Sequence, residues 1–264
     1  MMMHSLLIDA GVNLTSSQFD KDRAEMLSRA QLAGIDNMLL IGCCLQSSHD
    51  SLSFAEEFSY VCTAGIHPHD AKDAPIDFAD QIRALAVHPE VVAIGECGLD
   101  FNRDFSPRDV QKAVLEQHLS LANELNMPVY LHEREAFESM RSLLDKVSVK
   151  GVLHCFTGER EALEYYLEYG LSIGITGWLC DERRGEQLQK LLPLIPDDRL
   201  LLETDAPYLL PRSLKPKPKS RRNEPAFLHE VAKVAAELRG QSVEHVAKIT
   251  SDNFNRLFAP IRSK

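Results

Sequence analysis

The sequence lacks several features that would assign it to a class at once. None of its six cysteines forms a CxxC pair, and most lie in or beside apolar runs, which indicates reduced thiols in a cytoplasmic protein rather than a disulfide framework or a zinc cage. No stretch approaches the ~20 apolar residues that a membrane span requires. Met1–Asp9 has no Lys or Arg before its short apolar run, so we expect no signal peptide. Internal repeats are also lacking.

Positive charge is scarce as well. A formal net charge of −10 argues against a protein that coats nucleic acid by charge alone. It does not exclude an enzyme that acts on phosphodiesters, because bound cations can supply positive charge locally. The only concentrated basic stretch is a Pro-rich loop with five basic residues, which could follow a nucleic-acid backbone or be a solvated, stiffened loop. These residues are Lys215, Lys217, Lys219, Arg221 and Arg222.

What the sequence does contain is a regular alternation of short apolar runs and helical segments. The runs predict strands at Leu6–Asp9, Asn37–Gly42, Tyr60–Ile66, Val91–Gly95, Pro128–His132, Gly151–Cys155, Leu171–Ile175 and Leu200–Asp205. Helices are predicted at Asp20–Ala33, Ser47–Phe58, Phe78–Ala86, Pro107–Asn126, Ala136–Leu144, Glu159–Tyr169, Arg184–Leu192, Pro225–Leu238, Ser242–Ile249 and Ser251–Phe258. This pattern is typical of a (β/α)8 TIM barrel formed by a single domain over residues 1–264, with a doubly wound open sheet as the alternative.

Acids and histidines follow the apolar runs at their carboxyl ends. In a parallel barrel these ends converge on one mouth, where catalytic groups lie. Any one of them could be an ordinary hydrogen-bonding residue. Glu96 and Asp205 would repel each other at such a mouth unless a cation lay between them. The strand-end set is Asp9, His67, His69, Glu96, His132, His154 and Asp205.

This set predicts a divalent metal site. We expect His132 and His154 to be neutral ligands of one ion, with Glu96 bridging towards a second. Asp205 would be a ligand that also orients the attacking water or accepts its proton. Two carboxylates and two imidazoles suit Mg2+, Mn2+ or Zn2+, as one ion or two.

Six segments together resemble the TatD family of metal-dependent DNases, in order and over nearly the whole chain. They are Gly65–His69, Gly95–Asp100, Leu131–Ala136, His154–Gly158, Glu203–Leu209 and Arg222–Pro225. The resemblance implies an amidohydrolase-like barrel and a Mg2+-dependent 3′–5′ exonuclease. Its substrate would be single-stranded DNA, with RNA as a further candidate, and its role DNA repair or degradation.

The resemblance also implies roles for particular residues. The metal ligands would be Glu96, His132, His154 and Asp205, with Glu96 and Asp205 also catalytic. Substrate contacts are expected from His67, His69, Arg134, Arg222 and Asn223. Arg134 could instead pair with an acid, and Asn223 could simply cap a helix. Trp178 and Tyr208 could stack on a base or pack in the core.

One departure from the family pattern concerns the first strand. Most members carry Asp-x-His-x-His there, and both histidines bind the first metal. Here Gly11 and Asn13 replace them after Asp9. We therefore expect any second metal at Asp9 and Asn13 to be weak, or to be recruited with the substrate phosphate.

Two other functions remain open at this point. The first is an amidohydrolase of a small cyclic amide or lactone, but such enzymes usually keep the His-x-His pair and often a carboxylated Lys. The second is a binding protein whose site has decayed, which the four intact candidate ligands argue against. We expect no membrane partner and no obligate protein partner.

Overall fold

The computed structural model describes Leu7–Phe258. Leu6, where the first strand was predicted to begin, and most of the segment tested for a signal peptide lie outside these residues. The described chain forms two compact units. The first unit contains residues 7–39, 155–167 and 172–256, and the second contains residues 40–154 and 168–171 with Leu257 and Phe258. The prediction of a single domain is not tested by this division.

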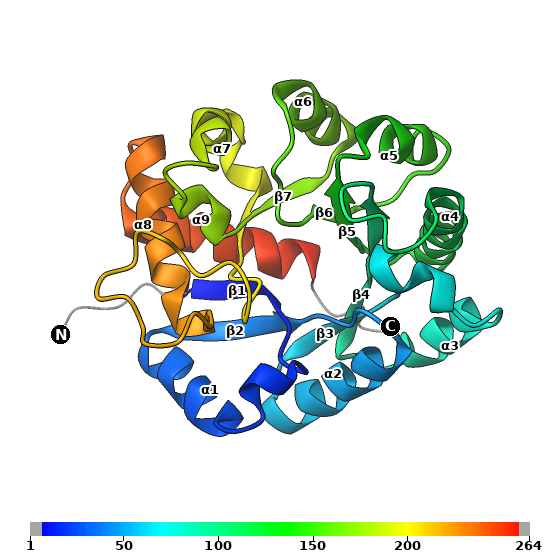
Figure 1. Ribbon diagram of the computed structural model, residues 1–264, viewed down its shortest axis with the longest axis horizontal. Coiled ribbons are helices and arrows are strands. Elements are labelled where there is room, and N and C mark those ends of the chain that lie inside the picture. Colours follow the sequence, from blue (N-terminus) through cyan, green and yellow to red (C-terminus); the bar gives the residue numbers. More distant parts are fainter. Residues whose placement is uncertain (1–6, 259–264) are drawn as a thin grey trace. The chain divides into compact units, whose positions relative to one another are not determined.

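Eight strands follow one another in one sheet in the same order as in the sequence, the strand order of a (β/α)8 barrel (Figure 1). They are β1 (Leu7–Val12), β2 (Ile35–Leu40), β3 (Val61–Ala64), β4 (Val91–Asp100), β5 (Val129–Arg134), β6 (Gly151–Leu153), β7 (Ser172–Ile175) and β8 (Leu200–Leu202). The strand pairs β3–β4, β4–β5, β5–β6 and β7–β8 are parallel. In the first unit, Val12 also pairs in parallel with Ala206, beyond β8.

The α-helices alternate with these strands. They are α1 (Arg23–Leu32), α2 (Leu45–Phe58), α3 (Phe78–Leu85), α4 (Arg108–Leu125), α5 (Phe137–Leu144), α6 (Arg160–Tyr169), α7 (Glu186–Leu191), α8 (Leu228–Arg239) and α9 (Val243–Leu257). In the second unit, α4 packs against β4 and lies between α3 and α5 (Figure 1).

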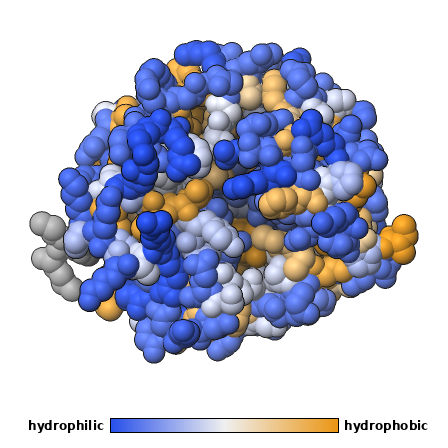
Figure 2. Space-filling view, viewed as in Figure 1, coloured by the Kyte–Doolittle hydropathy of each residue, from blue (hydrophilic) through white to orange (hydrophobic). Residues whose placement is uncertain are grey.

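The core follows from the sequence periodicity. The strands β1 and β4 are buried along their whole length, and β7 is too, because strands covered on both sides need apolar side chains on both faces. The helix α4 buries a stripe that includes Val114, Leu115, Leu119 and Ala122, and ends at Asn126 in a left-handed conformation with φ of 51°. Hydrophilic side chains predominate on the face drawn in Figure 2, with apolar ones among them.

Several predicted elements differ from the structure. The eighth strand was expected to reach Asp205 but ends at Leu202. The fourth strand was expected to end at Gly95 but continues to Asp100, with a register shift against β5 between Gly95 and Cys97. The two predicted C-terminal helices form one helix, α9. Within this helix the Thr250 hydroxyl donates to the carbonyl of Val246, 2.9 Å away.

A candidate metal centre on β4

Three imidazole nitrogens converge on a single carboxylate oxygen in the second unit. The Oε1 atom of Glu96, on β4, lies 2.8 Å from His154 Nε2, 3.0 Å from His132 Nδ1 and 3.2 Å from His67 Nε2. His132 belongs to β5, while His67 and His154 follow β3 and β6. The strand ends therefore gather these side chains as the sequence predicted.

Glycines allow the strands to come this close. A Cβ atom at Gly65 would lie 2.5 Å from backbone atoms of Gly95, directly before Glu96. Gly98 has φ of 154°, and a Cβ atom there would lie 1.9 Å from the carbonyl oxygen of His132. No other residue type fits either position without moving the backbone that carries Glu96 or His132.

The centre holds a buried negative charge. Burial by itself would raise the pKa of Glu96, but His154, His67 and His132 oppose it and hold this pKa well below its usual value. Burial also lowers the pKa of His67, which favours its neutral form. Burial lowers the pKa of His132 too, but Asp100 and Glu96 oppose it and leave this pKa raised. An ionised carboxylate beside imidazole nitrogens is a donor set that fits a divalent cation.

Two further observations test whether a metal ion fits. Ligand atoms of His67, Glu96 and His132 all lie within 4.8 Å of one another. The buried Nε2 atom of His132 has no hydrogen-bond partner among residues 7–258, and its distance of 3.6 Å to Asp100 is too long for a hydrogen bond. The residues present therefore fit a metal ion.

A backbone hydrogen bond determines which ring nitrogen of His67 carries the proton. Its Nδ1 atom accepts a hydrogen bond from the N–H of His69, at 3.1 Å. A neutral imidazole that accepts at Nδ1 carries its proton on Nε2, which here points to Glu96. In this arrangement the Nε2–H group of His67 is positioned to donate to Glu96.

Asp100 belongs to this site although the sequence analysis assigned it no role. Its Oδ2 atom lies 2.6 Å from His69 Nε2, and its Oδ1 atom accepts from the backbone N–H groups of Asn102 and Arg103. Burial raises its pKa, but the neighbouring His132 ring and the hydrogen bonds from His69 and the Arg103 N–H lower this pKa below its usual value, so Asp100 stays ionised. The sequence feature that could have identified Asp100 is its spacing from Glu96, because residues i and i+4 of a strand share a face.

A thiol contacts the other oxygen of Glu96. Cys43 Sγ lies 3.5 Å from Glu96 Oε2. The sequence predicted only a buried, reduced cysteine at this position. The whole of the Glu96 carboxylate is thus surrounded by side chains from several strand ends.

Asp205 lies in the first unit, in the segment that follows β8. Its Oδ1 atom accepts from Asn13 Nδ2 at 2.9 Å, its N–H donates to the carbonyl of Gly11 at 2.9 Å, and its φ is 55°. These contacts fix the direction of its carboxylate. Asn13, predicted as a weak metal ligand, points a donor group at this acid.

Asp9 is also held by protein groups. Its Oδ1 atom accepts from the N–H of Thr204 at 2.8 Å and its Oδ2 atom pairs with the Thr204 hydroxyl at 2.5 Å. Full burial raises the pKa of Asp9 to about 8 in spite of these bonds. The predicted second-metal role of Asp9 stays a prediction, which would require these hydrogen bonds to be exchanged.

The predicted substrate contacts have varied surroundings. Arg222 donates to both carboxylate oxygens of Asp22, to Glu224 and to the carbonyl of Gln18. Asn223 is fully buried, and its amide donates to the carbonyl of Thr204 at 3.0 Å. Arg134 ends β5. A substrate contact by any of these residues stays a prediction.

The two aromatic residues differ in exposure. Trp178 lies under the guanidinium of Arg184, 4.8 Å from the ring centre, whereas Tyr208 is 52% exposed. Core packing therefore does not account for Tyr208.

The comparisons with known proteins agree with this geometry. The sequence model of the family described as TatD related DNase matches residues 8–259. The chain belongs to this family. A 3'-5' ssDNA/RNA exonuclease TatD from Rahnella sp. (strain Y9602) is 54% identical over 258 residues, which cover 96% of this chain and 98% of the relative. The protein of the same name from Pantoea ananatis is 50% identical, with 97% of this chain and 100% of the relative covered.

Solved structures of TatD proteins confirm the predicted fold. A hydrolase of the TatD family from Entamoeba histolytica is 25% identical and has a TM-score of 0.89, covering 98% of this chain and 99% of its own. A TatD homologue from Escherichia coli K12 is 27% identical, with a TM-score of 0.87 and coverage of 96% and 97%. A dihydroorotase, 11% identical with a TM-score of 0.59, covering 96% of this chain and 72% of its own, shares the fold alone.

Membership of the TatD-related DNases confirms the predicted enzyme class, a hydrolase of phosphodiester bonds. The family is metal-dependent, and the cluster around Glu96 is a candidate metal site that agrees with this property. Among the helices of residues 7–258, none is long and apolar enough to cross a membrane.

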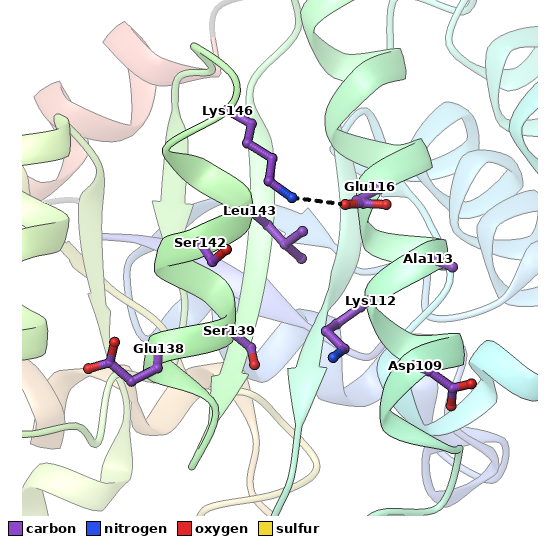
Figure 3. A pocket seen from close by; sticks show the side chains of 9 residues that line it. All are labelled: Asp109, Lys112, Ala113, Glu116, Glu138, Ser139, Ser142, Leu143 and Lys146. Atoms are coloured by element: carbon purple, nitrogen blue, oxygen red, sulfur yellow. Dashed lines mark hydrogen bonds and ion pairs between the residues drawn. The ribbon is translucent and has the colours of Figure 1, made fainter.

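A groove on the outside of the second unit has a different character. It has a volume of about 470 Å³ and lies between α4 and α5, where Lys146 pairs with Glu116 at 3.4 Å (Figure 3). Its lining mixes lysines, acids and serines and contains no histidine or cysteine. We therefore do not assign it to the chemistry of the TatD-related site.

Proposed function

We propose that this chain is a 3′–5′ exonuclease that hydrolyses phosphodiester bonds of single-stranded DNA and of RNA. The observation that carries the proposal is the convergence of three imidazole nitrogens on one oxygen of the ionised Glu96, in a chain of the TatD-related DNase family. Relatives that are at least 50% identical are named 3'-5' ssDNA/RNA exonucleases. The alternative, hydrolysis of a small cyclic amide or lactone, has only a shared fold in its support.

We assign the cation to Glu96, His132, His154 and Asp205, with Mg2+ as the physiological ion and Mn2+ or Zn2+ as substitutes. The unsatisfied, buried Nε2 atom of His132 supports a ligand role for this residue. When bound, a divalent ion would lower the pKa of the attacking water and stabilise negative charge on the phosphate.

The chain's own residues would orient the reacting groups. Asn13 and Gly11 hold Asp205 in one orientation, as required of a carboxylate that positions a water molecule and accepts its proton. His67 and His69 would contact the phosphate or protonate the leaving oxygen. The orientation of His69 is set by its 2.6 Å contact with Asp100. Arg134, Arg222 and Asn223 would add contacts to the substrate.

We also propose that residues 1–264 act as a single domain in the cytoplasm, with nucleic acid as the partner. The strand order β1 to β8 within one sheet supports a single barrel. The six cysteines form no disulfide among residues 7–258, which suits a reducing compartment.

The first test uses chelator-treated protein and a 5′-labelled single-stranded oligonucleotide, with Mg2+, Mn2+, Zn2+ or no metal. We expect a ladder that shortens from the 3′ end only when a metal is added. Glu96→Ala should abolish it, whereas Glu138→Ala, which removes an exposed carboxylate from α5, should not. If no metal restores cleavage, the exonuclease proposal is wrong and cyclic amides become the substrates to test.

A further inference from the structure

One large apolar side chain stands at the edge of the candidate metal centre. Phe105 is 55% exposed, and its ring centre lies 4.7 Å from that of His69 at an interplanar angle of 66°. Single exposed apolar residues are common and need no function, as for Ile76, which is 98% exposed. Phe105 differs because its exposed ring contacts a histidine of the site.

The exposure of Phe105 is imposed by an ordered segment. The next residue, Ser106, is fully buried; its hydroxyl donates to the carbonyl of His69 at 2.8 Å and accepts from the N–H of Lys72 at 3.0 Å. On the other side, Asp104 makes two hydrogen bonds with Arg108, of 2.7 and 2.8 Å. These bonds hold the backbone on both sides of Phe105, so that its ring points outward. A ligand that contacts the ring therefore restricts little further conformational freedom on binding.

Phe105 begins a series of edge-to-face ring contacts that leads to Glu96. The ring centres of His69 and His67 are 4.3 Å apart, and those of His67 and His132 are 4.6 Å apart. His67 and His132 both contact Glu96 Oε1. Phe105 is thus two ring contacts from a side chain that touches the central carboxylate.

We propose that Phe105 is a stacking platform for an unpaired nucleobase of the strand being cleaved. A flat apolar ring held beside a phosphodiester site offers a surface that every base can use, which gives affinity without sequence preference. Bases within a duplex are already paired and stacked, so the platform also favours single strands. This inference rests on the proposed nuclease function.

The experiment combines a substitution in the protein with a missing base in the substrate. Full-length protein with Mg2+ is given oligonucleotides that carry a single abasic residue at the first, second or third position from the 3′ end. Phe105→Ala removes the platform, Phe105→Leu keeps apolar volume without a flat ring, and Phe105→Trp keeps stacking. Ile76→Ala is the matched control for an exposed apolar residue, and thermal midpoints are measured for all variants.

Phe105→Ala should raise KM for the complete oligonucleotide about 5- to 150-fold, which corresponds to about 1–3 kcal/mol for one stacked base, with kcat nearly unchanged. Phe105→Leu should behave like the Ala variant, while Phe105→Trp and Ile76→Ala should retain the KM of the parent protein. At one abasic position the parent protein should lose the same factor, and Phe105→Ala should then add no further loss.

Three results would overturn the platform. They are an unchanged KM in Phe105→Ala, an equal loss on complete and abasic strands at every position, and rescue by Leu as good as by Trp. An equal increase in KM on complete and abasic strands would show that the Phe105 ring only packs against His69. If the parent protein cleaves nothing, the exonuclease proposal fails separately. The same cycle, measured by anisotropy of a labelled oligonucleotide, then decides whether Phe105 stacks on bases.

Discussion

Histidines in this protein take different roles according to what the backbone offers to each ring. His67 Nδ1 accepts the N–H of His69, so its Nε2 atom faces Glu96 as a donor. His118, on α4, accepts the N–H of Ile66 at its Nε2 atom, 3.0 Å away, and its Nδ1 atom lies 2.7 Å from the carbonyl of Val114. His118 is therefore a buried, neutral histidine that is hydrogen-bonded to the segment that carries His67.

The burial of neutral His118 predicts that the folded protein loses stability in acid. Burial lowers the pKa of His118 from 6.5 to about 4. Since the folded protein binds this proton more weakly than the unfolded chain, the stabilisation is complete above pH 6.5 and is lost as the pH falls towards 4. The full loss is about 3 kcal/mol. Urea unfolding at pH 7 and pH 4.5 measures it.

The matched pair is His118→Gln and His49→Gln. A glutamine side chain does not titrate, so the His118→Gln variant should lose less stability between the two pH values than the parent protein, even if it is weaker at pH 7. His49 is exposed on α2, and its replacement should keep the parent's pH dependence. Identical pH dependence in all three proteins would assign the acid sensitivity to other groups.

At the scale of elements, the decisive feature is where strands end and what ties the ends together. The strand β4 extends to Asp100, so that Glu96 and Asp100 stand on one strand face. In the first unit, Asp9 of β1 binds Thr204 after β8 through the backbone and the hydroxyl. Thr204 Oγ1 also accepts from the N–H of Ala206, at 3.1 Å. This buried network shapes the turn that presents Asp205.

Thr204→Val tests the network because it removes the hydroxyl while keeping the shape. The change leaves Asp9 Oδ2 and the Ala206 N–H without their buried partner, at a cost of about 1–3 kcal/mol for each. A cost of this size lowers the thermal midpoint by about 2–4 °C per kcal/mol in a chain of this size. Thr204→Ser, which keeps the hydroxyl, should stay close to the parent protein. Equal midpoints for the Val and Ser variants would mean that the hydroxyl is dispensable.

At the scale of the whole molecule, a net charge of −10 opposes the approach of nucleic acid. Lys215, Lys217, Lys219 and Arg221 are exposed or partly exposed in the loop after β8, as the sequence suggested.

Replacing Lys215, Lys217 and Lys219 by Ala should raise KM for single-stranded DNA and make it less sensitive to salt. If all three lysines meet phosphates, the slope of log KM against log salt should fall by about 2. The control removes the same charge elsewhere, with Ala at Lys112, Lys146 and Lys150 in the second unit. If both triple variants change the slope equally, net charge and not this loop governs binding.

Much of the architecture could be predicted because it depends on local patterns. Apolar runs of strand length, followed by helical periodicity, occur in order along the chain, and the strands pair in that same order. The errors lie at element boundaries, where β4 continues through glycines and α9 continues through polar residues. At such positions tertiary contacts outweigh local preference.

The sequence alone determined the strand order, the family and the candidate set at the strand ends, since these follow from periodicity and from short motifs. Only the tertiary structure decided which atoms meet. Asp9 and Thr204 are 195 positions apart, and Arg222 and Asp22 are 200 apart. The same holds for the ring nitrogens around Glu96, the inclusion of Asp100 and the exposure of Phe105. A side chain's hydrogen bonds and burial are set by neighbours that folding brings from distant segments, and no local pattern specifies them.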